Sequence, residues 1–123
     1  QLPPGDGPLL LMAPQGGNAD WPEPRWQELP GLLRTRLASV RSLLLPPGSK
    51  DLIQRTALLA SADVVLSSDP LSTELALLLG LPVVALGRSG ASLPQRQGVQ
   101  GLGEAASLSS LAADQVLKAL GFA

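Results

Sequence analysis

The chain has 123 residues, which is enough for one domain with its own hydrophobic core. Hydrophobic residues make up 45% and charged residues 15%, a composition typical of globular proteins and not of disordered ones. The net charge of −1, without any basic stretch, argues against binding to nucleic acid or to an anionic membrane surface. Cysteine and histidine are absent, which excludes disulfides, thiolate zinc sites, cysteine catalysis and the commonest general base. We therefore expect no metal site.

The sequence carries no recognisable targeting segment. No apolar run reaches the roughly 18 residues of a membrane span, and no signal peptide is visible. We expect a cytoplasmic protein, and Gln1 in place of Met indicates a piece cut or processed from a longer one. Residues 1–8, rich in Pro and Gly, predict a flexible linker or tail, and residues 9–123 a single domain.

The first elements are a strand, a loop and a helix. Residues 8–13 predict a short buried strand, and residues 15–20 a flexible polar loop. Gly16 and Gly17 permit positive φ angles and a close approach of a ligand to the backbone, although most such pairs form ordinary turns. A helix is predicted from Trp21 onward, with apolar side chains on one face: Trp26, Leu29, Leu33 and Leu37. Pro30 predicts a kink or a late start near Glu28. The two tryptophans are expected to be core anchors.

A second strand and helix follow. Residues 39–45 predict a strand, and Ser49 is the expected cap of the next helix, which runs to Ser61. Its expected inward face consists of Leu52, Ile53, Thr56, Leu59 and Ala60. Lys50 and Asp51 lie at the ligand end of the predicted sheet, where they contact a ribose or base, or form an ordinary solvated pair.

The central stretch predicts one βαβ unit. Residues 64–66 are apolar at every position, which suits a strand covered on both faces. Asp69 is the expected N-cap of a helix over residues 71–79 that is apolar nearly all round and therefore expected to be buried. Gly80 suits a left-handed C-cap, and residues 83–86 predict a second buried strand. Such a unit implies a parallel sheet.

The last part of the chain has a weaker pattern. Residues 99–102 predict a short edge strand. Ser109 or Ser110 is the expected cap of a final helix that ends at Gly121 and buries Leu111, Val116, Leu117 and Leu120. The whole pattern predicts an α/β fold, a Rossmann-like three-layer sandwich with a parallel sheet of four to five strands.

The turn after residues 64–66 is the candidate site. Ligands of open α/β sheets bind beyond the carboxyl ends of the strands. Ser68, Ser72 and Thr73 supply hydroxyls there, and the first amides of the helix are free to bind an anion such as a phosphate. The alternative, which is the commoner case for so short a motif, is that these residues only cap the helix.

Three groups of residues carry a resemblance to a known family: 14–17 with 21–22 and 26–29; 58–69 with 75–76 and 79–87; and 113–120. They resemble the C-terminal half of glycosyltransferase family 9, the heptosyltransferases of bacterial lipopolysaccharide synthesis. This family has the GT-B architecture of two facing Rossmann-like domains. The first group is similar to the family's glycine-rich loop and its Trp-Pro-x-x-x-Trp helix start, and the second is the most specific.

The resemblance implies a domain that binds the donor, a nucleotide-diphosphate sugar, without a metal or other cofactor. The family's catalytic base lies in the N-terminal, acceptor-binding domain, so we expect no catalytic residue here and no transfer by this chain alone. A full-length protein would contain that domain and would lie in the cytoplasm or peripherally at the inner membrane. The implied ligand-binding residues are Gly16, Gly17, Ser68, Ser72 and Thr73 for the diphosphate, Lys50 and Glu74 for ribose or base, and Asn18, Asp69 and Leu71 beside them.

The chain departs from the family at this site. The family usually reads Asp-(Ser/Thr)-Gly-Pro-x-His after the strand, whereas here Asp69 is kept, Leu71 replaces the Gly and Glu74 the His. Leu71 narrows the approach to the backbone, and Glu74 either bonds a ribose hydroxyl or repels the diphosphate. Asp20 stands where the family often has a basic residue before the Trp-Pro pair.

These departures leave three hypotheses open. The first is a donor-binding domain. The second is a related domain that has lost donor binding and acts as a structural or protein-interaction module. The third is a sugar-nucleotide epimerase of the two-domain type, which the Trp-Pro helix start fits poorly.

Overall fold

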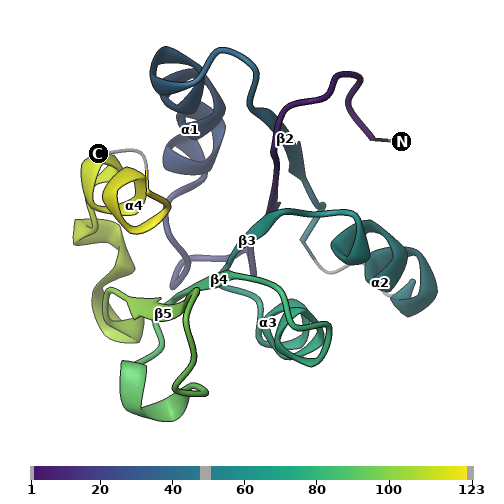
Figure 1. The fold of residues 1–123 in the computed structure, drawn as a ribbon. Helices are drawn as coiled ribbons and strands as arrows, with labels where there is room; N and C mark the ends of the chain where they lie inside the picture. Colours follow the sequence, from purple (N-terminus) through teal and green to yellow (C-terminus); the bar gives the residue numbers. More distant parts are fainter. Residues whose placement is uncertain (1, 48–50, 122–123) are drawn as a thin grey trace.

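The computed structural model describes residues 2–47 and 51–121, which form a parallel sheet between two layers of helices (Figure 1). The strands are β1 (Leu9–Ala13), β2 (Arg41–Leu44), β3 (Val64–Ser67), β4 (Val83–Leu86) and β5 (Val99–Leu102). They lie in the order β2-β1-β3-β4-β5, and every neighbouring pair is parallel. The predicted Rossmann-like α/β fold is confirmed, with five strands in the described residues.

The helices divide between the two faces of the sheet. They are α1 (Glu23–Arg36), α2 (Leu52–Ala60), α3 (Pro70–Leu78) and α4 (Ala113–Ala119), with short 3₁₀ helices η1 (Gly90–Ser92) and η2 (Ala105–Ser110). Helices α1 and α4 cover one face, and α2 and α3 the other (Figure 1). The chain moves one way along the sheet from β1 to β2 and the opposite way from β2 to β3, so right-handed crossovers require opposite faces. Among the described residues, no helix has the length and apolar character that a bilayer span needs.

Strand β1 is the centre of the core. All five of its residues are buried, and residues 10–13 alternate between two apolar clusters. Leu10 and Met12 contact the cluster under α1 and α4, and Leu11 and Ala13 the cluster under α2 and α3. A strand that is buried on both faces has no polar positions, which explains the continuous apolar run in the sequence.

Helix α1 begins at Glu23 and continues through Pro30 to Arg36, so the late start near Glu28 is wrong. Pro22 at the N-cap and Pro24 in the first turn are compatible with this start, because the first helical amides have no helical acceptor. The buried face consists of Trp26, Leu29 and Leu33, and Leu37 lies beyond the helix as its C-cap.

The two tryptophans are core anchors, as predicted. Their rings meet edge to face with centroids 5.3 Å apart. The indole Nε1 of Trp21 donates to the carbonyl oxygen of Leu111 at 2.9 Å, and that of Trp26 donates to the carbonyl of Trp21 at 3.0 Å. The pair thereby joins the start of α1 to the segment before α4.

The predicted inward face of α2 is confirmed at Leu59 and is wrong at Leu52, Ile53 and Ala60. Arg55 and Leu59 are its buried residues, whereas Leu52 and Ile53 are exposed. Asp51 is the N-cap and accepts a hydrogen bond from the amide of Gln54 at 2.9 Å. The expected cap, Ser49, lies outside the described residues.

Helix α3 is buried on one side only, so the expectation of burial all round is also wrong. Its inward side chains are small, Ser72, Thr73 and Ala76, and they allow the helix to lie close to the sheet. Leu71, Leu78 and Leu79 face outward. The C-cap prediction is confirmed, since Gly80 has a φ of +75°.

Helix α4 buries Val116 and Leu117, as expected, with Leu111 buried just before it. Its N-cap is Ala112, so the caps predicted at Ser109 and Ser110 are wrong. The side-chain oxygen of Gln115 accepts from the amide of Ala112 at 3.0 Å, which is the half of a capping box that the third helical residue supplies.

The N-terminal tail is tied to the sheet. The guanidinium group of Arg41 donates to the carbonyl oxygens of Gly7 at 2.8 Å and Pro3 at 3.0 Å. The described part of the tail therefore contacts β2.

Replacing Pro30 tests the strain inside α1. Proline has no N–H, so the carbonyl of Trp26 lacks its usual helical donor. Pro30→Ala is expected to raise the free energy of unfolding by about 1–2 kcal/mol in urea denaturation, after the loss of proline's effect on the unfolded chain. Pro24→Ala, in the first turn, is the matched control and should change it by less than about 0.5 kcal/mol. Equal effects of the two substitutions would contradict this account.

Candidate functional site

Two hollows open at the carboxyl edge of the sheet, where the strands end. The larger has a volume of about 740 Å³ and lies between residues 16–18, the start of α1 and residues 44–47 after β2. The smaller has a volume of about 230 Å³ and lies between Ser68, the start of α3 and residues 86–88 after β4. The glycine-rich loop, residues 15–19, contributes to the walls of both.

The smaller hollow lies at the switch point of the sheet. The chain leaves β1 toward β2 on one side, and β3 lies on the other side of β1. Gln15 follows β1, Ser68 follows β3, and both line this hollow. Open sheets with this strand order bind ligands where the connections diverge in this way.

The glycine-rich loop has the backbone conformation predicted for it. Gly16 and Gly17 have φ angles of +86° and +89°. A Cβ added at Gly16 would lie 2.9 Å from the Cβ of Pro47, so the loop approaches the end of β2 too closely for a side chain. Both glycines line the larger hollow, together with Asn18, which is exposed.

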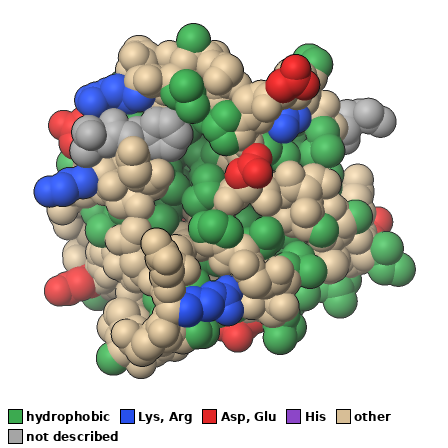
Figure 2. Space-filling model, viewed as in Figure 1, with side chains coloured by type: hydrophobic (Ala, Val, Ile, Leu, Met, Phe, Trp, Pro, Cys, Tyr) green, Lys and Arg blue, Asp and Glu red, His purple; other side chains and the backbone are tan. Residues whose placement is uncertain are grey.

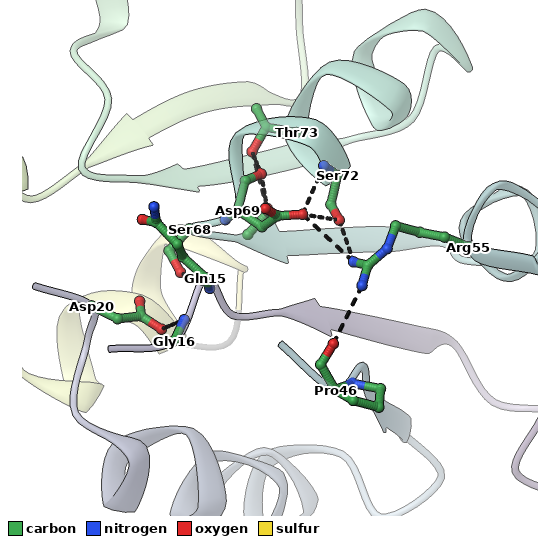
Figure 3. Close-up of polar contacts among 10 residues, drawn as sticks. Gln15, Gly16, Asp20, Pro46, Arg55, Ser68, Asp69, Ser72 and Thr73 are labelled. Carbon is green, nitrogen blue, oxygen red and sulfur yellow. Dashed lines mark hydrogen bonds and ion pairs between the residues drawn. The ribbon is translucent and has the colours of Figure 1, made fainter. Parts of the chain in front are cut away.

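Asp20 holds this loop from within (Figure 3). Its side chain is 5% exposed, and its carboxylate accepts from the amide of Gly16 at 2.9 Å and from that of Trp21 at 2.7 Å. Asp20 therefore occupies the amide of Gly16, a backbone donor of the glycine-rich loop.

Ser67, Ser68 and Asp69 connect β3 to α3. The Oγ of Ser68 accepts from the amide of Gln15 at 2.9 Å, which ties this turn to the glycine-rich loop. Asp69 caps α3, as predicted, and accepts from the amide of Ser72 at 3.0 Å and from its hydroxyl at 2.6 Å.

The hydroxyls of Ser72 and Thr73 do not project from this turn, contrary to the prediction. The two residues are 0% and 2% exposed. The Thr73 hydroxyl donates to the carbonyl of Asp69 at 2.9 Å and lies 3.0 Å from the Oγ of Ser67. Thr73 is among the residues that line the smaller hollow, whereas Ser72 lines neither hollow. The turn uses these alcohols to hold its own geometry.

Arg55 is a site residue that the sequence analysis missed. It belongs to α2, is 4% exposed, and places its guanidinium group between Pro46 on one side and Ser72 and Asp69 on the other (Figure 3). Its Nη1 donates to the Oγ of Ser72 at 2.6 Å and lies 3.6 Å from a carboxylate oxygen of Asp69, and its Nη2 donates to the carbonyl of Pro46 at 3.3 Å. The available signal was its position four residues before Leu59, which places both on one helical face.

Of the other predicted ligand-binding residues, two are exposed on α3 and one lies outside the described residues. Glu74 is exposed and pairs with Arg88, a residue of the smaller hollow, at 3.5 Å. Leu71 is exposed at the start of α3. Lys50 lies outside the described residues. In the described part of the chain no group of acidic, His or Cys side chains is arranged to hold a metal ion.

On the face shown in Figure 2, Lys and Arg side chains lie apart from one another among apolar, neutral and acidic groups. The cations of this face do not gather into one basic surface.

Comparison with known proteins gives a structural match. No protein-family model and no curated protein sequence matches the chain. The chain is similar to E. coli heptosyltransferase WaaC with ADP-2-deoxy-2-fluoro heptose, at 22% identity and a TM-score of 0.63 over 98% of this chain and 44% of that one. It is also similar to E. coli heptosyltransferase WaaC with ADP, at 23% identity and a TM-score of 0.64 over 93% and 43%.

The chain thus spans less than half the length of the proteins it matches. At this level of identity the match establishes the fold. It confirms the expected resemblance to the heptosyltransferase fold.

Removing Arg55 tests whether it fixes the turn after β3. Arg55→Met removes the donor to the carbonyl of Pro46 and to the buried Oγ of Ser72, and it removes the positive charge beside the Asp69 carboxylate. The free energy of unfolding is expected to fall by about 2 kcal/mol or more in urea denaturation. Arg25→Met is the matched control, because Arg25 forms an exposed pair with Glu28 at 3.1 Å. That change should cost less than about 0.5 kcal/mol. A loss no larger than the control's would show that Arg55 does not hold the turn.

Proposed function

We propose that the chain is the donor-binding part of a glycosyltransferase and binds a nucleotide-diphosphate sugar at the carboxyl edge of its sheet. The observation that carries the proposal is the hollow at the switch point beside the glycine-rich loop, in a fold similar to a heptosyltransferase solved with ADP and with an ADP-sugar. Cavities at this position of an open sheet are the usual ligand sites of such folds.

The two hollows bind different parts of the ligand, the nucleoside in the larger one and the phosphates in the smaller one. The larger, at about 740 Å³, falls in the range of roughly 300–1,000 Å³ typical of small-molecule sites. Its walls combine apolar Pro46, Pro47 and Leu44 with polar Asn18 and Gln27, which suits a nucleoside. The smaller, at about 230 Å³, is below that range and suits the phosphates.

Transfer requires more than this chain. The carboxylates among the described residues that line the two hollows are Asp20, which is bonded to two backbone amides, and Glu23, which is exposed. We propose that an acceptor-binding domain of the same full-length protein supplies the catalytic base, that no metal or other cofactor takes part, and that the protein acts in the bacterial cytoplasm, in lipopolysaccharide synthesis.

Titration of the isotope-labelled chain with ADP, UDP and GDP, and with their sugar derivatives, tests donor binding. One base series is expected to give saturable chemical-shift changes in residues 15–19 and 86–88, with a Kd between about 10 µM and 1 mM, because half of a two-domain site binds weakly. Adenosine, uridine and guanosine, which lack the diphosphate, are the controls and should bind more weakly. Silence in all three series would exclude the proposal.

A second candidate function is a domain without donor binding that acts as a structural or protein-interaction module. Two observations favour it: the Gly16 amide is bonded to Asp20, and the Ser72 amide is bonded to Asp69. Each reduces the set of donors that an anion can reach.

The double substitution Leu71→Gly with Glu74→His separates the two candidates. If donor binding has been lost, the double variant should gain nucleotide affinity, since it removes the leucine side chain in the first turn of α3 and one negative charge. Calorimetric titration with the same nucleotides measures the change. Micromolar binding by the unmodified chain would rule out this second candidate.

A further inference from the structure

Arg88 follows β4 at the edge of the smaller hollow and was not among the predicted site residues. Among the described residues that line the two hollows, it is the one cation. Its side chain is 33% exposed. Its Nε donates to the Oγ of Ser92 at 3.2 Å, its Nη2 donates to the carbonyl of Ser92 at 3.1 Å, and its Nη1 lies 3.5 Å from a carboxylate oxygen of Glu74.

These contacts leave part of the guanidinium group available. The group has five N–H donors, and the contacts to Ser92 and Glu74 use three. Ser68, in the wall of the same hollow, accepts a hydrogen bond from Gln15, but its own O–H has no acceptor among the described residues. Two side chains of one small hollow therefore offer donors that an anion can satisfy.

The contact with Glu74 is a weak competitor. The side chain of Glu74 is 60% exposed, and the separation of 3.5 Å is long for a charge-assisted hydrogen bond. Exposed ion pairs of this kind contribute little to stability. An anion in the hollow can therefore displace Glu74 at small cost.

We propose that Arg88, with Ser68 beside it, binds the diphosphate of the ligand in the smaller hollow, and that Glu74 lowers the affinity by competing for Arg88. The nucleotide part of this ligand rests on the proposed function. The planar fork of arginine suits two oxygens of a phosphate group, and a hollow of about 230 Å³ is too small for a whole nucleotide sugar.

Pyrophosphate, which lacks base and sugar, tests the anion site directly. The chain and its variants are titrated with pyrophosphate and with ADP at low ionic strength, where charge interactions are least screened. Arg88→Gln is expected to weaken pyrophosphate binding at least about tenfold, as expected for loss of a charged hydrogen-bond donor. Arg34→Gln is the matched control: Arg34 is exposed in the last turn of α1, at the opposite edge of the sheet, and its loss should change affinity less than about twofold.

Glu74→Gln provides the opposite change. It removes the competitor and one negative charge, so affinity for pyrophosphate should rise by about threefold or more. A gain of affinity cannot result from misfolding, which keeps the test decisive if Arg88→Gln is unstable.

The outcomes separate this inference from the proposed function. Equal binding by the unmodified chain and Arg88→Gln, or no pyrophosphate binding even by Glu74→Gln, would overturn the inference. If ADP binds and Arg88→Gln leaves its affinity unchanged, donor binding stands and the role of Arg88 falls. If pyrophosphate binding depends on Arg88 and no nucleotide binds more tightly than pyrophosphate, the anion site stands and the proposed donor fails.

Discussion

The carbonyl oxygen of Ala13, the last residue of β1, accepts hydrogen bonds from the amides of both Ser68 and Asp69, at 3.1 and 3.2 Å. This joint ties the end of β3 to the end of β1, where Ala13 and Ser67 are paired in register. The two strands therefore end side by side. After β1 the chain continues to one face of the sheet, and after β3 it continues to the other face. The connections diverge because right-handed crossovers require it, and the smaller hollow lies between them. The candidate site is thus a consequence of strand order.

Carboxylates of the protein accept hydrogen bonds from several N–H groups near this site. The strength of each of these contacts decides which N–H group is available to bind a ligand. Asp20 is buried and binds the amide of Gly16, and displacing such a charged hydrogen bond costs about 1.5–3 kcal/mol. Asp69 binds the amide of Ser72 and is also held by Arg55. The exposed pair of Glu74 and Arg88 is worth only about 0–1 kcal/mol. Arg88 is therefore the donor that an anion can recruit most readily.

Sequence pattern was sufficient for the fold and for the positions of the turns, but not for how the helices are rotated. Every strand was located, because buried parallel strands are short apolar runs between turn residues. Helix α3 has leucines on most sides, so its pattern contains no information on rotation, and the small residues Ser72 and Ala76 decide it by close packing. The hydrogen-bond partners of the site residues could not be predicted, because they lie far apart in the sequence. Gln15 and Ser68 are 53 residues apart, and Arg55 and Ser72 are 17 residues apart.

The engagement of Ser72 by Arg55 changes which part of the edge can bind an anion. A hydroxyl that accepts from a buried guanidinium group and donates to the helix cap is unavailable to a ligand, so the start of α3 serves to hold the turn. The next connection along the sheet is different, because Gly87, with a φ of +80°, turns the chain directly after β4. A Cβ added there would lie 3.4 Å from the Cα of Ala105, a contact at the close end of the ordinary range, and the positive φ would strain any side chain. This turn places Arg88 at the edge of the smaller hollow. Anion recognition at this edge is therefore better supported by the connection after β4 than by the helix start that the sequence motif indicated.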